Sequence, residues 1–353
     1  MTYYNEKLSL ISDSNNNIDL FRLVDGEIVQ YHFNYNKQSF SEKMVAKEVF
    51  LEYDASIDKE DYIYLIYQDM SFNLIMTLLK NDKLETIRLT GEPLPEIYYL
   101  NIIIDDKEPH IFYFVLLSEK KYRMYHHYFN GIDWITNTID EIVVDLLNPM
   151  GIFKRDKEVI CAYYNNIEEQ DIYMRIFDLQ KKEWGEKSRL TNNGEKKLYL
   201  DILIKDLNLH ITYCQYDEGN LVVKYERLIY EDGKIEREIE VTLSNPENPQ
   251  HPTLIYYEDK LWISWIEYDN VMSRYSEDMG SSWSPIYMWQ ESKKNDIVRY
   301  KYSKVSEEKD ILNHSFGKIN PDISFIGFGP TENTIEIALK KKAPLIFPKT
   351  PRI

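Results

Sequence analysis

Carboxylate side chains recur at a regular spacing along the chain, each after a run of apolar, strand-like residues. The group comprises Asp25 and Glu27, Asp69, Glu119, Glu168 and Glu169, Asp217 and Glu218, and Glu267 and Asp269. A ring of such groups around one mouth of a closed structure would attract cations, amines or a basic partner. Hairpin turns favour Asp, Asn and Gly in any case, and this ordinary turn chemistry is the preferred interpretation. Carboxylates on separate elements are expected to lie too far apart to share one ion. We therefore expect no tight metal site, at most a weakly bound calcium at the mouth, and no cofactor.

Several aromatic side chains near these acids have the shape to stack on sugar rings. Four of them look exposed: Tyr163, Tyr216, Trp265 and Tyr268. Aromatic residues of inner strands are more often part of the core, because they bury a large apolar area. The candidate ligand-binding residues form a short set: Asp69, Glu119, Asp217, Glu267, Trp265 and Tyr268.

Sequence patterns of known catalytic and metal sites do not occur. His126 and His127 are adjacent on a predicted strand, so their side chains point to opposite faces and cannot chelate one ion together. Cys161 and Cys214 have no zinc spacing and lie in apolar runs, where a buried free thiol is the ordinary interpretation. HExxH, Walker, GxSxG and dinucleotide-binding motifs are missing as well. No residue can be nominated as catalytic.

The elements that would position these residues repeat with a period of about fifty residues. One anchor is an Asp that closes an alternating strand before a short turn, at Asp13, Asp54, Asp106, Asp156, Asp206 and Asp259. A second anchor is an apolar residue in the turn before each fourth strand, at Phe40, Leu84, Trp134, Trp184, Ile235 and Trp283. This is the period of a four-stranded propeller blade, and helical periodicity appears nowhere.

The two anchors together predict an all-β fold, a β-propeller with six four-stranded blades. The predicted blades cover residues 1–46, 47–96, 97–148, 149–197, 198–251 and 252–293. Residues 294–353 break the repeat and form a C-terminal extension in which Val298 to Lys304, Asp322 to Phe328 and Thr334 to Leu339 read as strands. This extension is a partial seventh blade, a set of closing strands or a connector, and residues 344–353 are expected to be extended.

One turn carries a recognisable motif. Residues 276–283 read Ser-Glu-Asp-Met-Gly-Ser-Ser-Trp, in which Ser276, Asp278, Gly280 and Trp283 hold the defining positions. The Asp278 carboxylate can accept backbone N–H groups of its own turn. Gly280 supplies a positive φ, and Trp283 anchors the turn on the sheet. The motif resembles the Asp box (BNR repeat) of sialidase-like β-propellers, in which it is structural and lies away from the active site.

The resemblance implies a fold more than an activity. Sialidases hold their substrate with three arginines and an early Arg-Ile-Pro motif, of which Phe21-Arg22-Leu23-Val24 is only a faint echo. In a blade with strands A to D from the inside outwards, the A–B and C–D turns share one face. The B–C and D–A loops share the other, which is the usual binding face. We therefore expect non-catalytic recognition of a glycan or protein on the B–C and D–A loops. The alternative is a diverged, sialidase-like glycoside hydrolase.

Composition excludes several partners. The formal net charge of −17 opposes binding to nucleic acid and to anionic membranes, both of which select basic patches. No apolar run approaches the roughly 20 residues of a membrane span, and the first nine residues do not resemble a signal peptide. A cytoplasmic location is the default expectation, and an extracellular or surface-associated one applies if a signal was removed. The sequence leaves the oligomeric state open.

Overall fold

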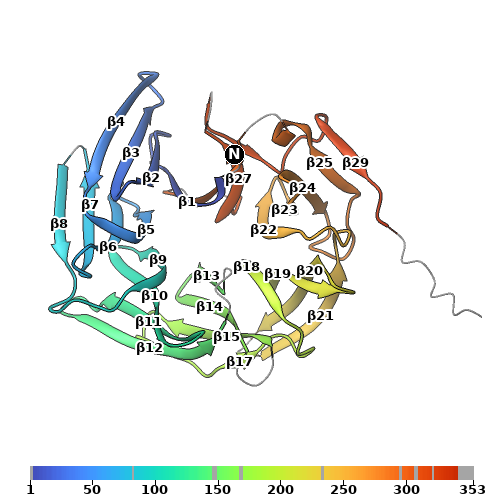
Figure 1. Cartoon of the computed structure of the whole chain (residues 1–353), viewed down its shortest axis with the longest axis horizontal. Coiled ribbons are helices and arrows are strands. Elements are labelled where there is room, and N and C mark those ends of the chain that lie inside the picture. The colour runs from blue at the N-terminus through green and yellow to red at the C-terminus, as the bar shows by residue number, and fades with distance from the viewer. Residues whose placement is uncertain are drawn as a thin grey trace, which may run out of the picture.

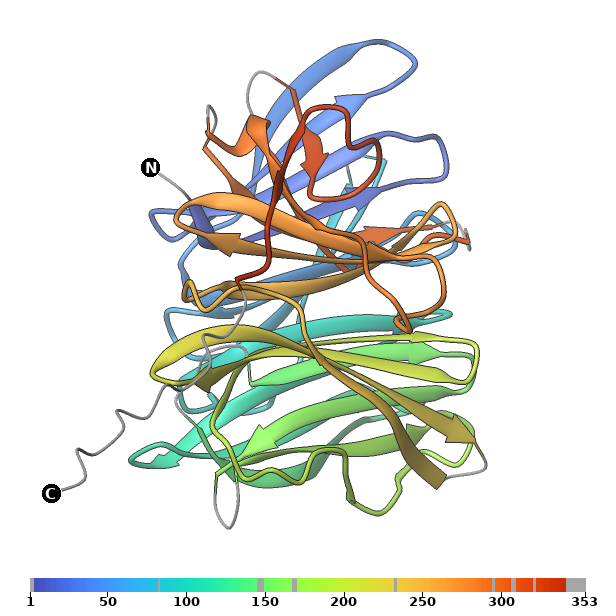
Figure 2. The ribbon, with the colours of Figure 1, turned by 90° about the vertical axis from the view of Figure 1, so that its right-hand side faces the viewer.

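The computed structural model describes residues 3–81, 83–144, 149–166, 170–231, 234–293, 296–305, 309–319 and 322–340. These residues form six sheets arranged in a ring (Figure 1), five of them antiparallel and one mixed, and the sheets stack side by side when the ring is seen edge-on (Figure 2). The protein is a six-bladed β-propeller, which confirms the predicted fold class. Among the described residues, no helix has the length and apolar character that a membrane span requires.

The first three blades each contain four strands, joined in chain order by hairpin turns. Blade one is built from β1 (Tyr3–Ser12), β2 (Ile18–Val24), β3 (Glu27–Asn34) and β4 (Ser39–Ala46). Blade two is built from β5 (Val49–Ile57), β6 (Ile63–Asp69), β7 (Leu74–Lys80) and β8 (Lys83–Arg88). Blade three is built from β9 (Ile97–Asp105), β10 (Glu108–Ser118), β11 (Lys121–Phe129) and β12 (Trp134–Val143).

The other three blades follow the same plan with changes at the outer edge. Blade four has β13 (Met150–Arg155), β14 (Glu158–Asn165), β15 (Asp171–Asp178) and two short outer pieces, β16 (Glu183–Trp184) and β17 (Ser188–Arg189). Blade five has β18 (Lys197–Lys205), β19 (Asn208–Asp217), β20 (Asn220–Glu231) and β21 (Lys234–Thr242). Blade six has β22 (Gln250–Tyr257), β23 (Lys260–Glu267), β24 (Asn270–Ser276) and β25 (Ile286–Trp289). Strands β1 to β25 follow the predicted blades, except that β18 begins at Lys197 and β22 at Gln250, just before the predicted boundaries.

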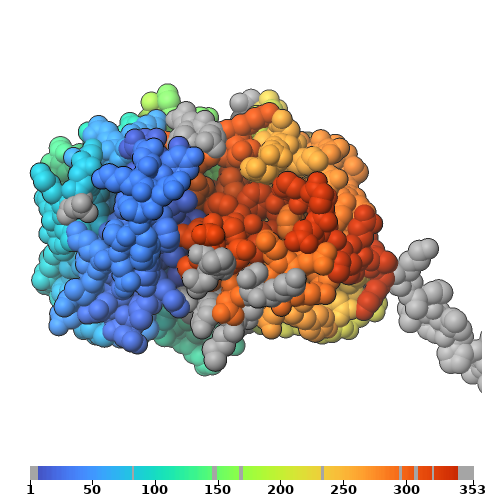
Figure 3. Space-filling model, turned by 90° about the horizontal axis from the view of Figure 1, so that it is seen from above, coloured from blue at the N-terminus to red at the C-terminus, as the bar shows by residue number. Residues whose placement is uncertain are grey.

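The C-terminal residues add strands to the first and the last blade. After a short 3₁₀ helix, η1 (Gln290–Lys293), the chain forms β26 (Val298–Lys304), β27 (His314–Lys318), β28 (Ser324–Ile326) and β29 (Thr334–Ile337). β26 pairs in parallel with β1, and β29 adds a fifth strand to blade six. The N-terminal and C-terminal segments therefore lie side by side at the surface of the ring (Figure 3). The division into a propeller of 1–293 and an extension of 294–353 stays a prediction, and residues 344–353 lie outside the described part.

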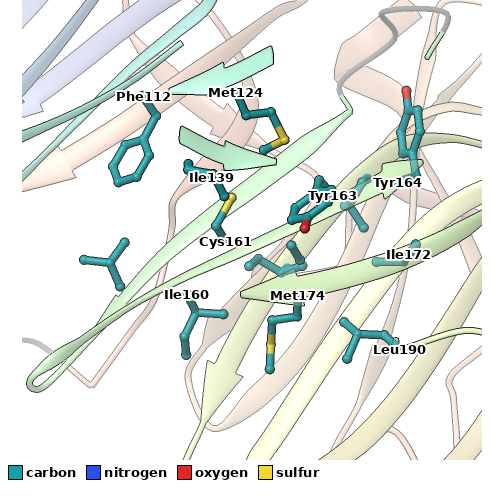
Figure 4. Close-up of a cluster of buried hydrophobic side chains, with 14 of the residues drawn as sticks. Phe112, Met124, Ile139, Ile160, Cys161, Tyr163, Tyr164, Ile172, Met174 and Leu190 are labelled. Atoms are coloured by element: carbon teal, nitrogen blue, oxygen red, sulfur yellow. The ribbon is translucent and has the colours of Figure 1, made fainter. Parts of the chain in front are cut away.

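Layers of apolar side chains between neighbouring blades form the core. Around blade four, Phe112 and Met124 of blade three belong to one buried cluster with Ile160, Cys161 and residues of β15 (Figure 4). Successive side chains of a strand point to opposite faces of the blade, and both faces carry apolar residues. Each blade therefore packs against the blade on either side of it. Both cysteines are buried and unpaired, and burial raises their pKa values.

Buried carboxylates connect the inner strands of neighbouring blades. Asp54 accepts the backbone N–H of Ile102 at 2.7 Å, and Asp201 accepts that of Leu254 at 2.9 Å. Lys301 of β26 pairs with Asp54 and donates to the Ile102 carbonyl at 2.9 Å. The sequence prediction that Asp54 closes its strand is wrong, because Asp54 lies inside β5. The turn carboxylate of blade two is Asp58, which accepts the N–H groups of residues 60 and 62.

Candidate ligand-binding cleft between blades one and two

The layer between blades one and two is apolar towards one end and polar towards the other. Phe21 and Ile28 of blade one belong to a buried cluster that includes Leu65 of blade two. Asp19 lies two residues before Phe21 on β2, and Gln30 lies two residues after Ile28 on β3, so each shares a strand face with its apolar neighbour. Since side chains of alternate residues share a face, the apolar packing ends where these polar groups begin.

The polar end of this layer is a cleft with a volume of about 650 Å³. Blade one lines it with Asp13, Asn15, Asn17, Asp19, Gln30, His32, Asn34, Lys37, Ser39, Ser41 and Lys43. Blade two lines it with Glu60, Asp61, Ile63, Leu79, Lys80, Asn81, Lys83 and Leu84. Several of these belong to A–B and C–D turns, so the cleft opens on the face that carries those turns. Its volume lies within the range of small-molecule sites.

Asp19 is the central polar residue of the cleft. Its side chain is 5% exposed, and its Oδ1 accepts Gln30 Nε2 at 2.7 Å and lies 2.8 Å from His32 Nδ1. The three residues lie on adjacent strands, and His32 stands directly opposite both Asp19 and Ser41 in the strand register. A carboxylate, an amide and an imidazole are therefore fixed on rigid strands rather than on loops.

The remaining acids of the cleft are engaged in other contacts. Asp13 Oδ1 accepts the backbone N–H groups of Asn15 and Asn17, each at 2.8 Å. Asp61 accepts the backbone N–H of residue 14 at 2.9 Å and its hydroxyl at 2.6 Å. Glu60 pairs with Lys107 at 2.6 Å, and this hydrogen bond lowers the pKa of Glu60. Asp19 differs from these acids, because its partners are side chains of a neighbouring strand inside the layer between the two blades.

At the cleft, the anchor position of blade two holds a leucine, where blades four and six hold a tryptophan. In blade four the same position is Trp184, whose ring packs 5.4 Å from that of His126 in blade three. In blade six it is Trp283, whose ring lies 5.0 Å from that of Tyr225 in blade five. Blade two has Leu84, which is 42% exposed, and so the space that indole rings fill elsewhere stays open.

The predicted ligand-binding residues lie on blades two, three, five and six, and none of them lines this cleft. Asp69 accepts the N–H groups of residues 71 and 73 within its own turn, at 2.9 and 2.8 Å. Glu119 and Tyr268 are exposed, Asp217 is half-buried, and Tyr268 donates to Glu247 at 2.7 Å. Glu168 and Glu169 lie outside the described residues. The structure does not bring Asp69, Glu119, Asp217 and Tyr268 together, and the role of these residues in binding stays a prediction.

Two of the candidate residues, Trp265 and Glu267, are buried, and for Trp265 this agrees with the preferred interpretation of inner-strand aromatic residues as core. Trp265 is fully enclosed in the core between blades five and six, so it cannot stack on a sugar at the surface. Its indole N–H donates to Glu267 at 2.8 Å. Burial raises the pKa of Glu267 to about 7. Trp265 and Glu267 are two residues apart on β23, so both side chains point to the same, inward face. The spacing alone does not tell whether that face is buried or exposed.

The turn at residues 276–283, whose sequence resembles an Asp box, connects blade six to blade five. Ser282 donates its hydroxyl to Asp278 at 2.7 Å and its backbone N–H at 2.8 Å, and these two hydrogen bonds lower the pKa of Asp278 to about 2. The N–H of Gly280 binds the Ser276 hydroxyl at 2.7 Å. Arg227 of blade five donates to the carbonyl of residue 279 at 2.8 Å. Gly280 has φ +91°, and a Cβ there would lie 2.0 Å from the hydroxyl of Tyr225. Local conformation and close packing both require glycine.

The sequence analysis did not identify the cleft residues. The available signals were weak: Asp19 is the one polar residue among Phe21 and Leu23 on its face of β2, Gln30, His32 and Asn34 share one face of β3, and Leu84 departs from the aromatic anchor. Among the described residues, no group of three or more His, Cys, Asp or Glu side chains is placed to hold a metal ion.

Comparison with known proteins identifies the fold. No protein-family model and no curated protein sequence matches the chain. A mutant lectin from Aleuria aurantia in complex with Fucα1-6GlcNAc is 10% identical, with 81% of this chain and 96% of the lectin covered and a TM-score of 0.50. A neuraminidase-like protein of A/flat-faced bat/Peru is 11% identical, with 81% and 88% covered and a TM-score of 0.44. A thermostable family-43 glycoside hydrolase is 13% identical, with 69% and 98% covered and a TM-score of 0.38. The Aleuria lectin is itself a six-bladed β-propeller, which agrees with the blades of this chain.

Proposed function

We propose that the protein is a non-catalytic recognition module that binds a glycan in the cleft between blades one and two. The observation that carries the proposal is the Asp19–Gln30–His32 group, fixed on three strand positions beside an open volume of about 650 Å³. The expectation of a ligand on the B–C and D–A loops stays a prediction.

The chemistry of the walls suits a hydroxyl-rich ligand. Carboxylate oxygens accept hydroxyl protons, amides donate and accept at once, and an imidazole does either according to its tautomer. Leu84 of blade two offers exposed apolar surface on which the C–H face of a sugar ring can pack, and the buried side chains of Ile63 and Leu79 complete that wall. Acids and lysines both line the cleft, so neither sign of charge dominates, and a neutral sugar fits it better than a strongly charged ligand.

The lectin likeness supports the proposal only at the level of the fold, since that fold can carry glycan recognition in the complex with Fucα1-6GlcNAc. Glycoside hydrolysis with two carboxylates would need a second acid facing Asp19 across the sugar. The other acids of the cleft hold turns or pair with lysine. This engagement favours recognition over the hydrolase alternative.

A glycan array followed by calorimetry tests the proposal. The labelled full chain is screened, and the best-bound glycan is titrated into wild type, Asp19→Asn and Leu84→Trp. Asp19→Asn removes a charge-assisted acceptor, for which we expect an affinity loss of about tenfold or more. Leu84→Trp installs the residue that fills the corresponding layers of blades four and six, so we expect binding to be abolished and the melting temperature to be retained.

Ile235→Trp is the matched control, because it makes the same kind of change at the anchor position of blade five, where the layer is already packed. It should leave the affinity unchanged. Retained binding by Leu84→Trp would place the glycan site elsewhere. An array without any bound glycan would reject the function itself.

A further inference from the structure

Exposed apolar side chains gather at the B–C turns, on the face opposite the cleft opening. Val24, Met70, Leu116, Leu117, Tyr216 and Tyr268 lie at or next to the ends of the second strands of five blades. Their exposed fractions range from 37% for Val24 to 72% for Tyr268. The corresponding turn of blade four lies partly outside the described residues. Blades one, two, three, five and six thus each present at least one large apolar group on this face, which we call the B–C face.

Exposed carboxylates accompany these apolar groups. Asp25, Glu119, Glu218 and Asp269 are all exposed, and each lies within two residues of an apolar member of the set. Lys120 is the lone basic residue within the described turns themselves. The B–C face therefore alternates apolar and acidic groups around the ring. Acids alone would be ordinary turn chemistry, but leucine, methionine and tyrosine at exposed turns are not explained by it.

We propose that the B–C face docks a basic polypeptide whose lysines or arginines alternate with apolar side chains. Cations of the partner complement the carboxylates and steer its approach, while its apolar groups cover the exposed side chains. Two copies of this chain meeting through this face would oppose like charges, and an anionic membrane or nucleic acid would be repelled for the same reason. The apolar members lie on different blades, so the partner spans more than one blade.

This docking is independent of the glycan proposal. The cleft is lined by A–B and C–D turns, whereas the B–C face lies at the other end of every blade. The propeller then carries two recognition surfaces, one for a hydroxyl-rich small ligand and one for a protein. Failure of either proposal leaves the other standing.

The test titrates a fluorescent peptide of alternating lysine and leucine into the full chain, with an alternating lysine and serine peptide as the second probe. Binding is measured by anisotropy at low and moderate salt. The double variant Met70→Ser and Leu117→Ser should weaken binding of the lysine–leucine peptide at least tenfold. The double variant Asp25→Asn and Glu119→Gln should also weaken it and reduce its salt dependence. The lysine–serine peptide should bind wild type at least tenfold more weakly.

The matched control is the double variant Tyr35→Ser and Ile132→Ser, which removes two exposed apolar residues from C–D turns on the other face. Its affinity for the lysine–leucine peptide should equal that of wild type. Hydrogen exchange should show peptide-dependent protection at residues 24–27 and 116–121, and none at 35–38. Equal binding of both peptides, an equal loss in the control, or stronger binding of the chain to anionic phospholipid vesicles would overturn the proposal.

Discussion

Glu267 makes the stability of the protein depend on pH. Its pKa is raised from 4.5 to about 7, mainly by burial, so the fold favours the neutral acid. Below pH 4.5 the acid is neutral in both the folded and unfolded states and costs nothing. As the pH rises from about 4.5 to 7, the unfolded state ionises first, and the folded state loses stability, by roughly 3 kcal/mol in all.

Glu267→Gln should therefore become more stable than wild type as the pH is raised from 5 to 8. Glutamine keeps an acceptor for the indole N–H of Trp265 and removes the buried charge. Urea unfolding at both pH values measures the difference. Glu119→Gln, an exposed acid of the same face, is the control and should show little pH-dependent change. A stability difference that is the same at pH 5 and pH 8 would contradict the assignment.

The Asp-box residues are expected to set stability and leave ligand affinity alone. Asp278→Ala removes the acceptor of the Ser282 N–H, and Trp283→Ala empties part of the layer against Tyr225. For Trp283→Ala we expect a loss of about 3 kcal/mol, and for Asp278→Ala a lowered melting temperature. The check is thermal melting together with glycan affinity at low temperature. Wild-type melting combined with lost binding would make this turn a binding site.

At the scale of elements, the ion pair between Lys301 of β26 and Asp54 of blade two gives a further prediction. Lys301 is 15% exposed, burial lowers its pKa, and its partner Asp54 is fully buried. Lys301→Met leaves that carboxylate buried without its cation, which typically costs about 3–5 kcal/mol. Denaturant unfolding measures the loss. Adding Asp54→Asn, which removes the charge and keeps an acceptor for Ile102, should restore much of it.

Lys260→Met is the comparison for that experiment. Lys260 pairs with Glu277 at 3.0 Å, but the two side chains are 35% and 67% exposed. Because solvent screens such a pair, we expect a cost below about 1 kcal/mol. If the two lysine variants lost equal stability, the buried ion pair between Lys301 and Asp54 would contribute no more than an exposed pair, which would contradict the prediction.

The repeat was predictable from sequence because every blade restates the same local chemistry. Strand alternation, turn acids and anchors of the Trp184 type recur with one period, so the blade boundaries could be read directly. The cleft could not, since it depends on which residues meet across two blades. Leu84 and Ile235 are both small anchors, yet Ile235 packs against a filled core and Leu84 borders an open volume. Only the facing side chains of the preceding blade separate the two cases.

Two acids that have the spacing of turn residues are buried within strands instead. Asp54 has the spacing of a turn acid but sits within β5, where it binds the next blade. Glu267 has the spacing of a surface acid but turns inwards with Trp265. A shift of one residue along a strand exchanges the two faces, and sequence spacing does not fix that register.

For the molecule as a whole, we expect no sialidase activity. The Arg-Ile-Pro element is missing from the sequence, and the cleft is lined by lysines without an arginine. Incubation with the 4-methylumbelliferyl conjugate of sialic acid should release no fluorophore above the background of a heat-inactivated sample. Release at a rate that Arg22→Ala abolishes would overturn this expectation.

The parallel pairing of β1 with β26 also sets a timetable for the growing chain. Leu8 pairs with Tyr300, so β1 finds this partner only after a further 292 residues (300 − 8) have been made. At typical synthesis rates that interval is on the order of 15–60 s. During it β1 offers an unpaired edge to any other strand nearby, a known route to aggregation. The contact between β1 and β26, which closes the ring, is thus the strand pairing for which the nascent chain waits longest. We therefore expect blade one to be the part of the nascent chain that most needs a chaperone.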